Sequence, residues 1–266
     1  MLKTFDFQYP VYTDLILAFK QAGYVFLTFL EYIQNKSKGE LPEKFILLRH
    51  DVEEHYPNAL KFAQIQNQLG IKGTYFFRLL PTSFKQEIVK QIVDLGHEVG
   101  YHYDDLAVCK GDYKKAIERF QKNLGILRAI APVQTICMDG SPLSKYDNKE
   151  LWKKYNYQDF GIIGEPYFDI DFNTVFYLTD TGRCWNGSKF SIRDKVLKEK
   201  AADWPSYHKT EDIINAVKKG DFPKQSMLTF HPQRWNDAFG PWLKELLWQN
   251  VKNQLKRIIV MKSNRS

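Results

Sequence analysis

Apolar runs alternate with amphipathic segments along most of the chain. Phe45-Ile46-Leu47-Leu48 is a continuous apolar run of the kind expected in a strand buried on both faces. Runs of similar character, rich in aromatic and β-branched residues, recur between turn signals. They predict strands at 45–53, 73–78, 98–104, 133–138, 160–163, 175–178 and 226–232, and either a strand or a segment of the outer wall at 24–30.

Between these runs, apolar residues recur at helical spacing. Several such segments end in a glycine, among them Gly70, Gly96 and Gly220, which suits a helix C-terminus. We expect helices at 6–22, 58–70, 83–95, 112–130, 147–155, 210–219 and 240–261. Strand and helix alternate with short connections, which predicts an α/β fold with a parallel sheet or barrel of about six to eight strands. A single domain over residues 1–266 is the simplest organisation.

The composition narrows the class of protein. The net charge is +7, but 38 Lys and Arg are mixed with 31 Asp and Glu and form no long basic block, so we expect no nucleic-acid partner. The three cysteines are widely separated, which argues against a disulfide framework. The first residues lack the apolar core of a signal peptide, and no segment is long and apolar enough to span a membrane. We therefore expect a cytoplasmic protein.

Reactive side chains gather where predicted strands end. In a parallel fold the C-terminal ends of all strands meet at one face, so these side chains are expected to converge. The set comprises Asp51 and Glu53, His102 and Asp105, Asp139, Asp180 and Arg183, and His231.

The end of the predicted strand 45–53 has two acidic residues close together in sequence. Strand alternation places Asp51 and Glu53 on the same side, where one carboxylate can hold a metal ion and the other can take a proton from water. The alternative is a purely structural strand end, in which Arg49 neutralises Asp51.

The histidines at or near the predicted strands can be structural or functional residues. His97, near a strand start, is expected to be a buried, hydrogen-bonded residue. His102, at a strand end, suits a metal ligand or a structural residue equally. His231 precedes Pro232 at the end of an apolar strand and suits a general acid oriented by a carboxylate, or again a structural residue.

Taken together, these stretches resemble motifs of the polysaccharide deacetylase (NodB-homology) superfamily. Members of that superfamily fold as a distorted (β/α) barrel and remove acetyl groups from amino sugars. Arg49-His50-Asp51-Val52-Glu53 resembles the first motif, and Gly96-His97-Glu98-Val99-Gly100-Tyr101-His102 is similar to the second. Leu228-Thr229-Phe230-His231 resembles the fifth, and the resemblance runs from about Phe45 to about Trp235.

The resemblance implies roles for particular residues. Asp51 is implied as catalytic base, Glu53 and His102 as ligands of a divalent metal, best zinc, and His231 as general acid with Asp180 as its partner. A carbohydrate substrate is implied as well. The residues expected to bind it are Tyr101, Tyr103, Trp185 and Trp235, as rim aromatics suited to stacking on sugar, together with Ser141 and Arg183.

The chain also departs from the superfamily pattern. Leu106 occupies the position of the second histidine of the metal motif, and Glu53 stands where aspartate is usual. Residues 139–148 take the place of an arginine-containing third motif. The third metal ligand therefore stays open, with Asp105 the first choice and Asp104 or His97 as alternatives.

Two classes of function follow. The leading interpretation is a metal-dependent hydrolase that removes an N-acetyl group from a sugar or sugar conjugate. The alternatives are a catalytically inactive barrel that binds a glycan or a protein partner, motivated by Leu106, and a hydrolase of another non-peptide C–N bond.

Overall fold

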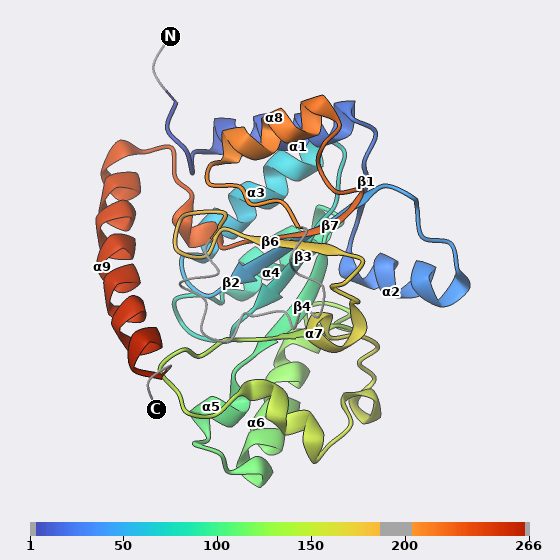
Figure 1. Ribbon diagram of the computed structural model, residues 1–266. Helices are drawn as coiled ribbons and strands as arrows, with labels where there is room; N and C mark the ends of the chain where they lie inside the picture. Colours follow the sequence, from blue (N-terminus) through green and yellow to red (C-terminus); the bar gives the residue numbers. More distant parts are fainter. Residues whose placement is uncertain (1–3, 187–203, 264–266) are drawn as a thin grey trace.

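The computed structural model describes residues 4–186 and 204–263, which are built around one parallel sheet (Figure 1). The sheet has seven strands in the order β5-β4-β3-β2-β7-β6, with β1 paired to β2 outside that path. All six strand pairings are parallel. The strands are β1 (Val25–Leu27), β2 (Phe45–Val52), β3 (Thr74–Phe77), β4 (Glu98–Tyr103), β5 (Ile136–Met138), β6 (Phe176–Thr179) and β7 (Gln225–Phe230). The predicted α/β fold with a parallel sheet is confirmed.

The sheet curls into part of a barrel and remains open. β5 and β6 form its two ends, and no strand within the described residues joins them. β2 lies at the centre, since β7 pairs along one of its edges while β1 and β3 share the other. Its eight residues are all buried, as the continuous apolar run predicted.

Helices cover the outside of the curled sheet. In Figure 1, α1, α3 and α8 lie together on one side, α5 and α6 on the other, and α9 runs along the end of the molecule. The α-helices are α1 (Tyr9–Gln21), α2 (Phe29–Lys38), α3 (Tyr56–Gln68), α4 (Gln86–Asp94), α5 (Asp105–Val108), α6 (Tyr113–Arg128), α7 (Pro166–Asp169), α8 (Thr210–Lys219) and α9 (Phe239–Ser263). Short 3₁₀ helices are η1 (Asn148–Lys153), η2 (Tyr157–Phe160) and η5 (Pro232–Arg234).

Several predicted elements differ from the structure: the helix at 147–155 is the 3₁₀ helix η1, and two predicted strands differ more strongly. The expected strand at 24–30 stops at Leu27, because the Thr28 side chain and Glu31 form a reciprocal capping box that starts α2. The expected strand at 160–163 is replaced by η2, which Gly161 ends with a φ of 67°. The Thr-x-x-Glu signal was present in the sequence, but the apolar run Tyr24–Leu30 concealed it.

The inner face of the curl is filled at its lower end. Phe45, Leu47, Phe76 and Met227 from the strands pack there with Phe29 of α2 in one buried cluster. Beside this cluster, Glu98 accepts from the hydroxyls of Thr74 and Thr135, so the N-terminal end of the sheet is closed by apolar packing and one internally bonded polar group. Asp51, Glu53, His102, Asp139 and His231 lie together at the opposite end, where the strands end.

Candidate active site

Alternation along β2 separates the residues of the first motif. Arg49 and Asp51 share one face, while His50 points to the other and stacks on Tyr75 with ring centroids 4.2 Å apart. His50 Nδ1 lies 3.1 Å from the Thr74 carbonyl oxygen, and its Nε2 lies 2.9 Å from the Gln66 amide nitrogen. Burial lowers the pKa of His50 to about 3, so it is a neutral structural residue.

Asp51 is held by the arginine two residues before it. Arg49 Nε and Nη2 donate to the two carboxylate oxygens of Asp51 over 2.8 and 2.7 Å, and both side chains are buried. Burial alone would raise the pKa of Asp51, but Arg49, His102 and His231 outweigh it and keep the pKa below its usual value. Asp51 is therefore ionised and fixed in orientation.

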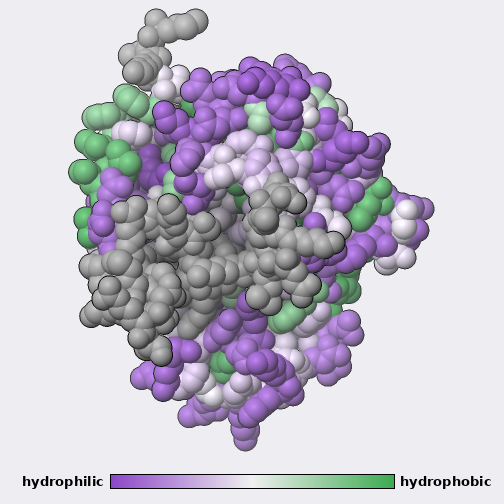
Figure 2. Space-filling view, viewed as in Figure 1, coloured by the Kyte–Doolittle hydropathy of each residue, from purple (hydrophilic) through white to green (hydrophobic). Residues whose placement is uncertain are grey.

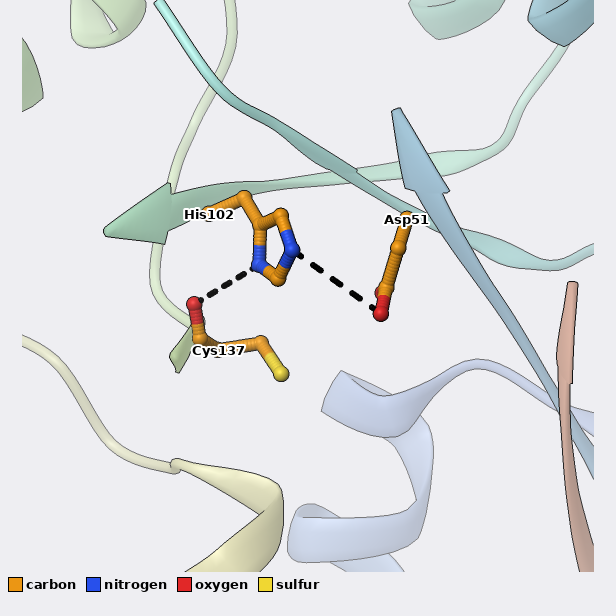
Figure 3. A group of neighbouring side chains, drawn as sticks. All are labelled: Asp51, His102 and Cys137. Carbon is orange, nitrogen blue, oxygen red and sulfur yellow. Dashed lines mark hydrogen bonds and ion pairs between the residues drawn. The ribbon is translucent and has the colours of Figure 1, made fainter. Parts of the chain in front are cut away.

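The Nε2 atom of His102 lies at the centre of the candidate site. Nδ1 of His102 donates to the Cys137 carbonyl oxygen over 3.0 Å, which turns Nε2 toward Asp51 (Figure 3). That Nε2 atom is buried and has no hydrogen-bond partner among the described residues. It lies 3.9 Å from Asp51 Oδ2, 4.0 Å from Glu53 Oε1 and 3.8 Å from Asp139 Oδ2.

The surrounding carboxylates make this position favourable for a positive charge. Burial acts to lower the pKa of His102, but the carboxylates of Asp51, Glu53 and Asp139 have a larger and opposite effect. Together they raise the pKa of His102 to about 9. Burial likewise acts to raise the pKa of Glu53, and His102 and His231 hold it well below its usual range. Three carboxylates thus surround one imidazole ring that is positively charged at neutral pH.

Asp139 is aimed into this group by the turn after β5. Its backbone N–H donates to the Tyr103 carbonyl oxygen over 2.8 Å, so the β4–β5 pairing continues to this residue. Its Oδ1 accepts from the Ser141 backbone N–H and hydroxyl over 2.8 and 2.6 Å. Oδ2 is left facing His102 and lies 3.6 Å from Arg78 Nη1. The sequence marked Asp139 as a polar strand end, but not as a ligand; the Asp-Gly-Ser turn after a strand was the available signal.

Among residues 4–186 and 204–263, two sets of side chains have donor atoms close enough to hold one metal ion. They are Glu53, His102 and Asp139, and Asp51, His102 and Cys137, each with donor atoms within 4.8 Å of one another. Around a tetrahedral zinc ion bound at about 2.0–2.2 Å, donor atoms lie roughly 3.4 Å apart, so the first set fits after small side-chain movements. The second set fits less well, because Arg49 already binds both oxygens of Asp51. The unpartnered His102 Nε2 belongs to the arrangement in either case.

Asp105, the third ligand expected from the sequence, lies outside both sets. Its carboxylate accepts from Arg119 over 2.5 Å and from the Tyr101 hydroxyl over 2.8 Å, and Asn123 lies 3.4 Å away. Burial raises the pKa of Asp105 to about 7. β4 ends at Tyr103, so the chain has entered α5 at Asp105 and turns this side chain toward α6.

His231 approaches the group from the opposite wall. Its Nδ1 lies 2.6 Å from Asp180 Oδ1, and its Nε2 lies 3.8 Å from Glu53 Oε1. Asp180 also accepts from Arg234 Nη1 and Trp235 Nε1 over 2.7 and 2.8 Å. The Asp180 carboxylate, fully buried among these donors, orients the imidazole with Nε2 toward the carboxylates.

The four aromatic residues expected at the rim are buried instead. Tyr101, Tyr103, Trp185 and Trp235 are at most 2% exposed, so none of them offers a ring face to solvent. Tyr101 and Tyr103 alternate with His102 and therefore point to the helix-covered face of β4. Trp185 donates to Thr210 and Trp235 to Asp180, so each indole is used internally.

Arg183 is also drawn away from the site. Its Nη1 donates to the Trp242 carbonyl oxygen over 2.9 Å, and its guanidinium lies 4.8 Å from the Trp242 ring. Arg183 therefore secures the start of α9. Ser141 does line the pocket beside the carboxylates, in addition to holding Asp139.

A pocket of about 370 Å³ opens directly over Glu53 and Asp139. Its walls are the apolar side chains of Ala107, Val108, Pro142 and Leu143, and Arg78 provides its positive charge. Leu143 is 89% exposed at the lip. The candidate site is thus accessible from solvent through an apolar opening with a charged floor.

No helix among the described residues combines the length and apolar character needed to cross a bilayer.

No protein-family model matches the chain, and no curated protein matches it.

Solved structures do match the chain, with identities that limit the likeness to the fold. The Streptococcus pyogenes deacetylase PplD in complex with acetate is 17% identical, with 56% of this chain and 70% of that chain covered and a TM-score of 0.41. BA3943, a CE4 family pseudoenzyme from Bacillus anthracis, is 15% identical, with 82% and 66% covered and a TM-score of 0.43. A CE4 esterase from Streptococcus mutans is 15% identical, with 85% and 86% covered and a TM-score of 0.41. Since these matches include a pseudoenzyme as well as a deacetylase, they do not separate an active hydrolase from an inactive relative.

Proposed function

We propose that this protein is a metal-dependent hydrolase that removes an N-acetyl group from a sugar or sugar conjugate. The observation that carries the proposal is the buried, unpartnered Nε2 of His102, which faces three carboxylates while a second imidazole, held by Asp180, faces the same group. A buried polar atom without a hydrogen bond is uncommon in a native protein, and a bound ion is one way to satisfy it. The resemblance of the motifs around Asp51, His102 and His231 to those of polysaccharide deacetylases gives the reaction class.

Glu53, His102 and Asp139 would hold the divalent ion. Two carboxylates and one imidazole suit zinc, and also manganese or cobalt. Such an ion, when bound, supplies Lewis-acid chemistry that polarises the acetyl carbonyl and acidifies water.

Asp51 would act as the general base. Its carboxylate lies 3.9 Å from His102 Nε2 and is not needed as a ligand in the proposed set. Arg49 lowers its basicity but fixes its position, and a fixed base has the geometric advantage of an intramolecular reaction. Asp51 would take the proton of the attacking water.

His231 would act as the general acid. Because Nδ1 is directed at Asp180, the proton that leaves for the amine would come from Nε2, on the side of Glu53. The sugar would occupy the pocket between Val108 and Leu143, with the acetyl group toward Asp139.

A second candidate is an inactive barrel that binds a glycan or a protein. Leu106 in place of the second histidine favours it, and so does the engagement of both Asp51 oxygens by Arg49. Protein purified without chelators distinguishes the candidates through its metal content and through acetate release from a panel of N-acetyl sugars.

One equivalent of zinc, with acetate release that is lost in His102→Ala, supports the hydrolase. Absence of both metal binding and acetate release favours the binding protein. Bound zinc without acetate release from any sugar points to another C–N bond as the substrate.

A further inference from the structure

The final helix, α9, has its polar and apolar sides reversed relative to a helix that packs on a core. Gln249 and Asn253 are 2% and 8% exposed and face the body of the protein. Leu247, Trp248 and Val251 are 59%, 56% and 51% exposed on the other side. A surface helix normally buries its apolar stripe, so the outward stripe calls for a partner.

The inward side of α9 is fixed by specific hydrogen bonds. Trp242 Nε1 donates to the Asp6 carbonyl oxygen over 2.8 Å, and Asn253 Nδ2 donates to the Gly182 carbonyl oxygen over 3.0 Å. Gln249 donates to Asn253 over 2.9 Å. Because these bonds use the polar residues, the helix cannot rotate to bury its apolar side without breaking them.

The outward side combines apolar area with positive charge. Figure 2 shows hydrophobic surface at the upper left of the molecule, over the first part of α9, beside hydrophilic surface. Phe239, 58% exposed, begins the helix, and Lys252 lies over the Trp248 ring at 5.6 Å. In the part of α9 whose side chains are described, Lys244 and Lys252 are accompanied by one acidic residue, Glu245, and the whole chain has a net charge of +7.

We propose that α9 docks the protein on an anionic phospholipid surface, with Leu247, Trp248 and Val251 in the headgroup region. Helices that combine an apolar stripe with lysine and arginine bind at the bilayer interface, where tryptophan is also favoured. A second copy of the chain fits this face less well. In a symmetric dimer the face meets itself, and Lys244 and Lys252 of one copy would then lie close to the same residues of the other.

The test uses the full chain and vesicles of phosphatidylcholine with or without phosphatidylserine. Co-flotation is expected with the vesicles that contain phosphatidylserine, to decrease with added salt, and to be weaker by about tenfold or more for the Trp248→Glu/Val251→Glu variant. Ile126→Glu changes an exposed apolar residue on α6 and is expected to bind as the original protein does. If the double variant does not fold, Lys244→Glu/Lys252→Glu keeps the apolar stripe and is expected to lose binding to the anionic vesicles.

Two results would overturn the proposal. One is equal or absent flotation of the original protein with the two kinds of vesicle. The other is a dimer by light scattering that Trp248→Glu converts to a monomer, which would assign the face to a second copy.

Discussion

Nε2 of His102 lies 3.8 Å from Oδ2 of Asp139, although the two residues end different strands. β4 and β5 are neighbours, and the Asp139 N–H extends their pairing to Tyr103, so the contact follows from the register of the sheet. Asp139 thereby supplies a carboxylate to a site in which Leu106 replaces the expected second histidine.

Asp139→Ala is expected to lower zinc affinity by more than about 100-fold. Loss of a residue that only hydrogen-bonds to a metal ligand lowers metal affinity by up to about 100-fold, so a larger loss indicates a direct ligand. The measurement is competition with a chromogenic chelator. Asp105→Asn is the matched control, because Asp105 is bound by Arg119 and Tyr101 and should leave zinc affinity unchanged. The reverse order of effects would reassign the third ligand to Asp105.

Asp51→Asn is expected to separate chemistry from metal binding. If Asp51 is the base, kcat for acetate release should fall by about 10²–10⁴-fold while zinc content remains at one equivalent. Glu53→Gln should lose both zinc and activity. Loss of zinc in Asp51→Asn would instead favour the alternative set of Asp51, His102 and Cys137.

Zinc binding is expected to release a proton from His102. Its pKa of about 9 in the metal-free protein means that the imidazole is protonated at neutral pH, whereas a ligand must be neutral. Apparent affinity should therefore rise about tenfold per pH unit as pH increases from about 6 to 9, and then level off. Calorimetry in buffers of different ionisation enthalpy should give about one proton released per zinc near neutral pH. An affinity independent of pH over this range would exclude His102 as a ligand.

The sequence was sufficient to predict the parallel sheet and the convergence of Asp51, His102 and His231, because strand ends depend only on local pattern. It was not sufficient to choose the carboxylate that completes the proposed ligand set. Asp105 and Asp139 both follow a strand, and their directions depend on whether the chain continues the pairing, as at Asp139, or enters a helix, as at Asp105. The prediction that aromatic residues line the rim was wrong for a related reason. Tyr101 and Tyr103 alternate with His102 along β4, so they point to the face of the sheet that the helices cover.

Gly100→Ala tests the packing beneath the site. A Cβ at Gly100 would lie 2.4 Å from Cδ1 of the buried Phe76 ring, so the substitution should reduce the free energy of unfolding by about 1–3 kcal/mol. Gly125→Ala is the control within α6, where a Cβ meets nothing within 4 Å, and it should add about 0.5–1 kcal/mol. Denaturant unfolding measures both. Equal effects of the two substitutions would mean that the close Phe76 contact does not constrain Gly100.

Val108→Trp tests whether the pocket over Glu53 and Asp139 receives the substrate. Val108 is 48% exposed on one wall, so an indole can replace it without disturbing the core and would fill part of the space of about 370 Å³. We expect kcat/KM for acetate release to fall by about tenfold or more, equivalent to roughly 1.4 kcal/mol, mainly through KM. Zinc content should stay the same, since Val108 touches no proposed ligand set. Ile126→Trp adds the same ring at an exposed position on α6 that does not line the pocket, and it should leave both constants unchanged. If Val108→Trp is as active as Ile126→Trp, the substrate reaches Asp51 and His231 by another route and the pocket has no part in binding it.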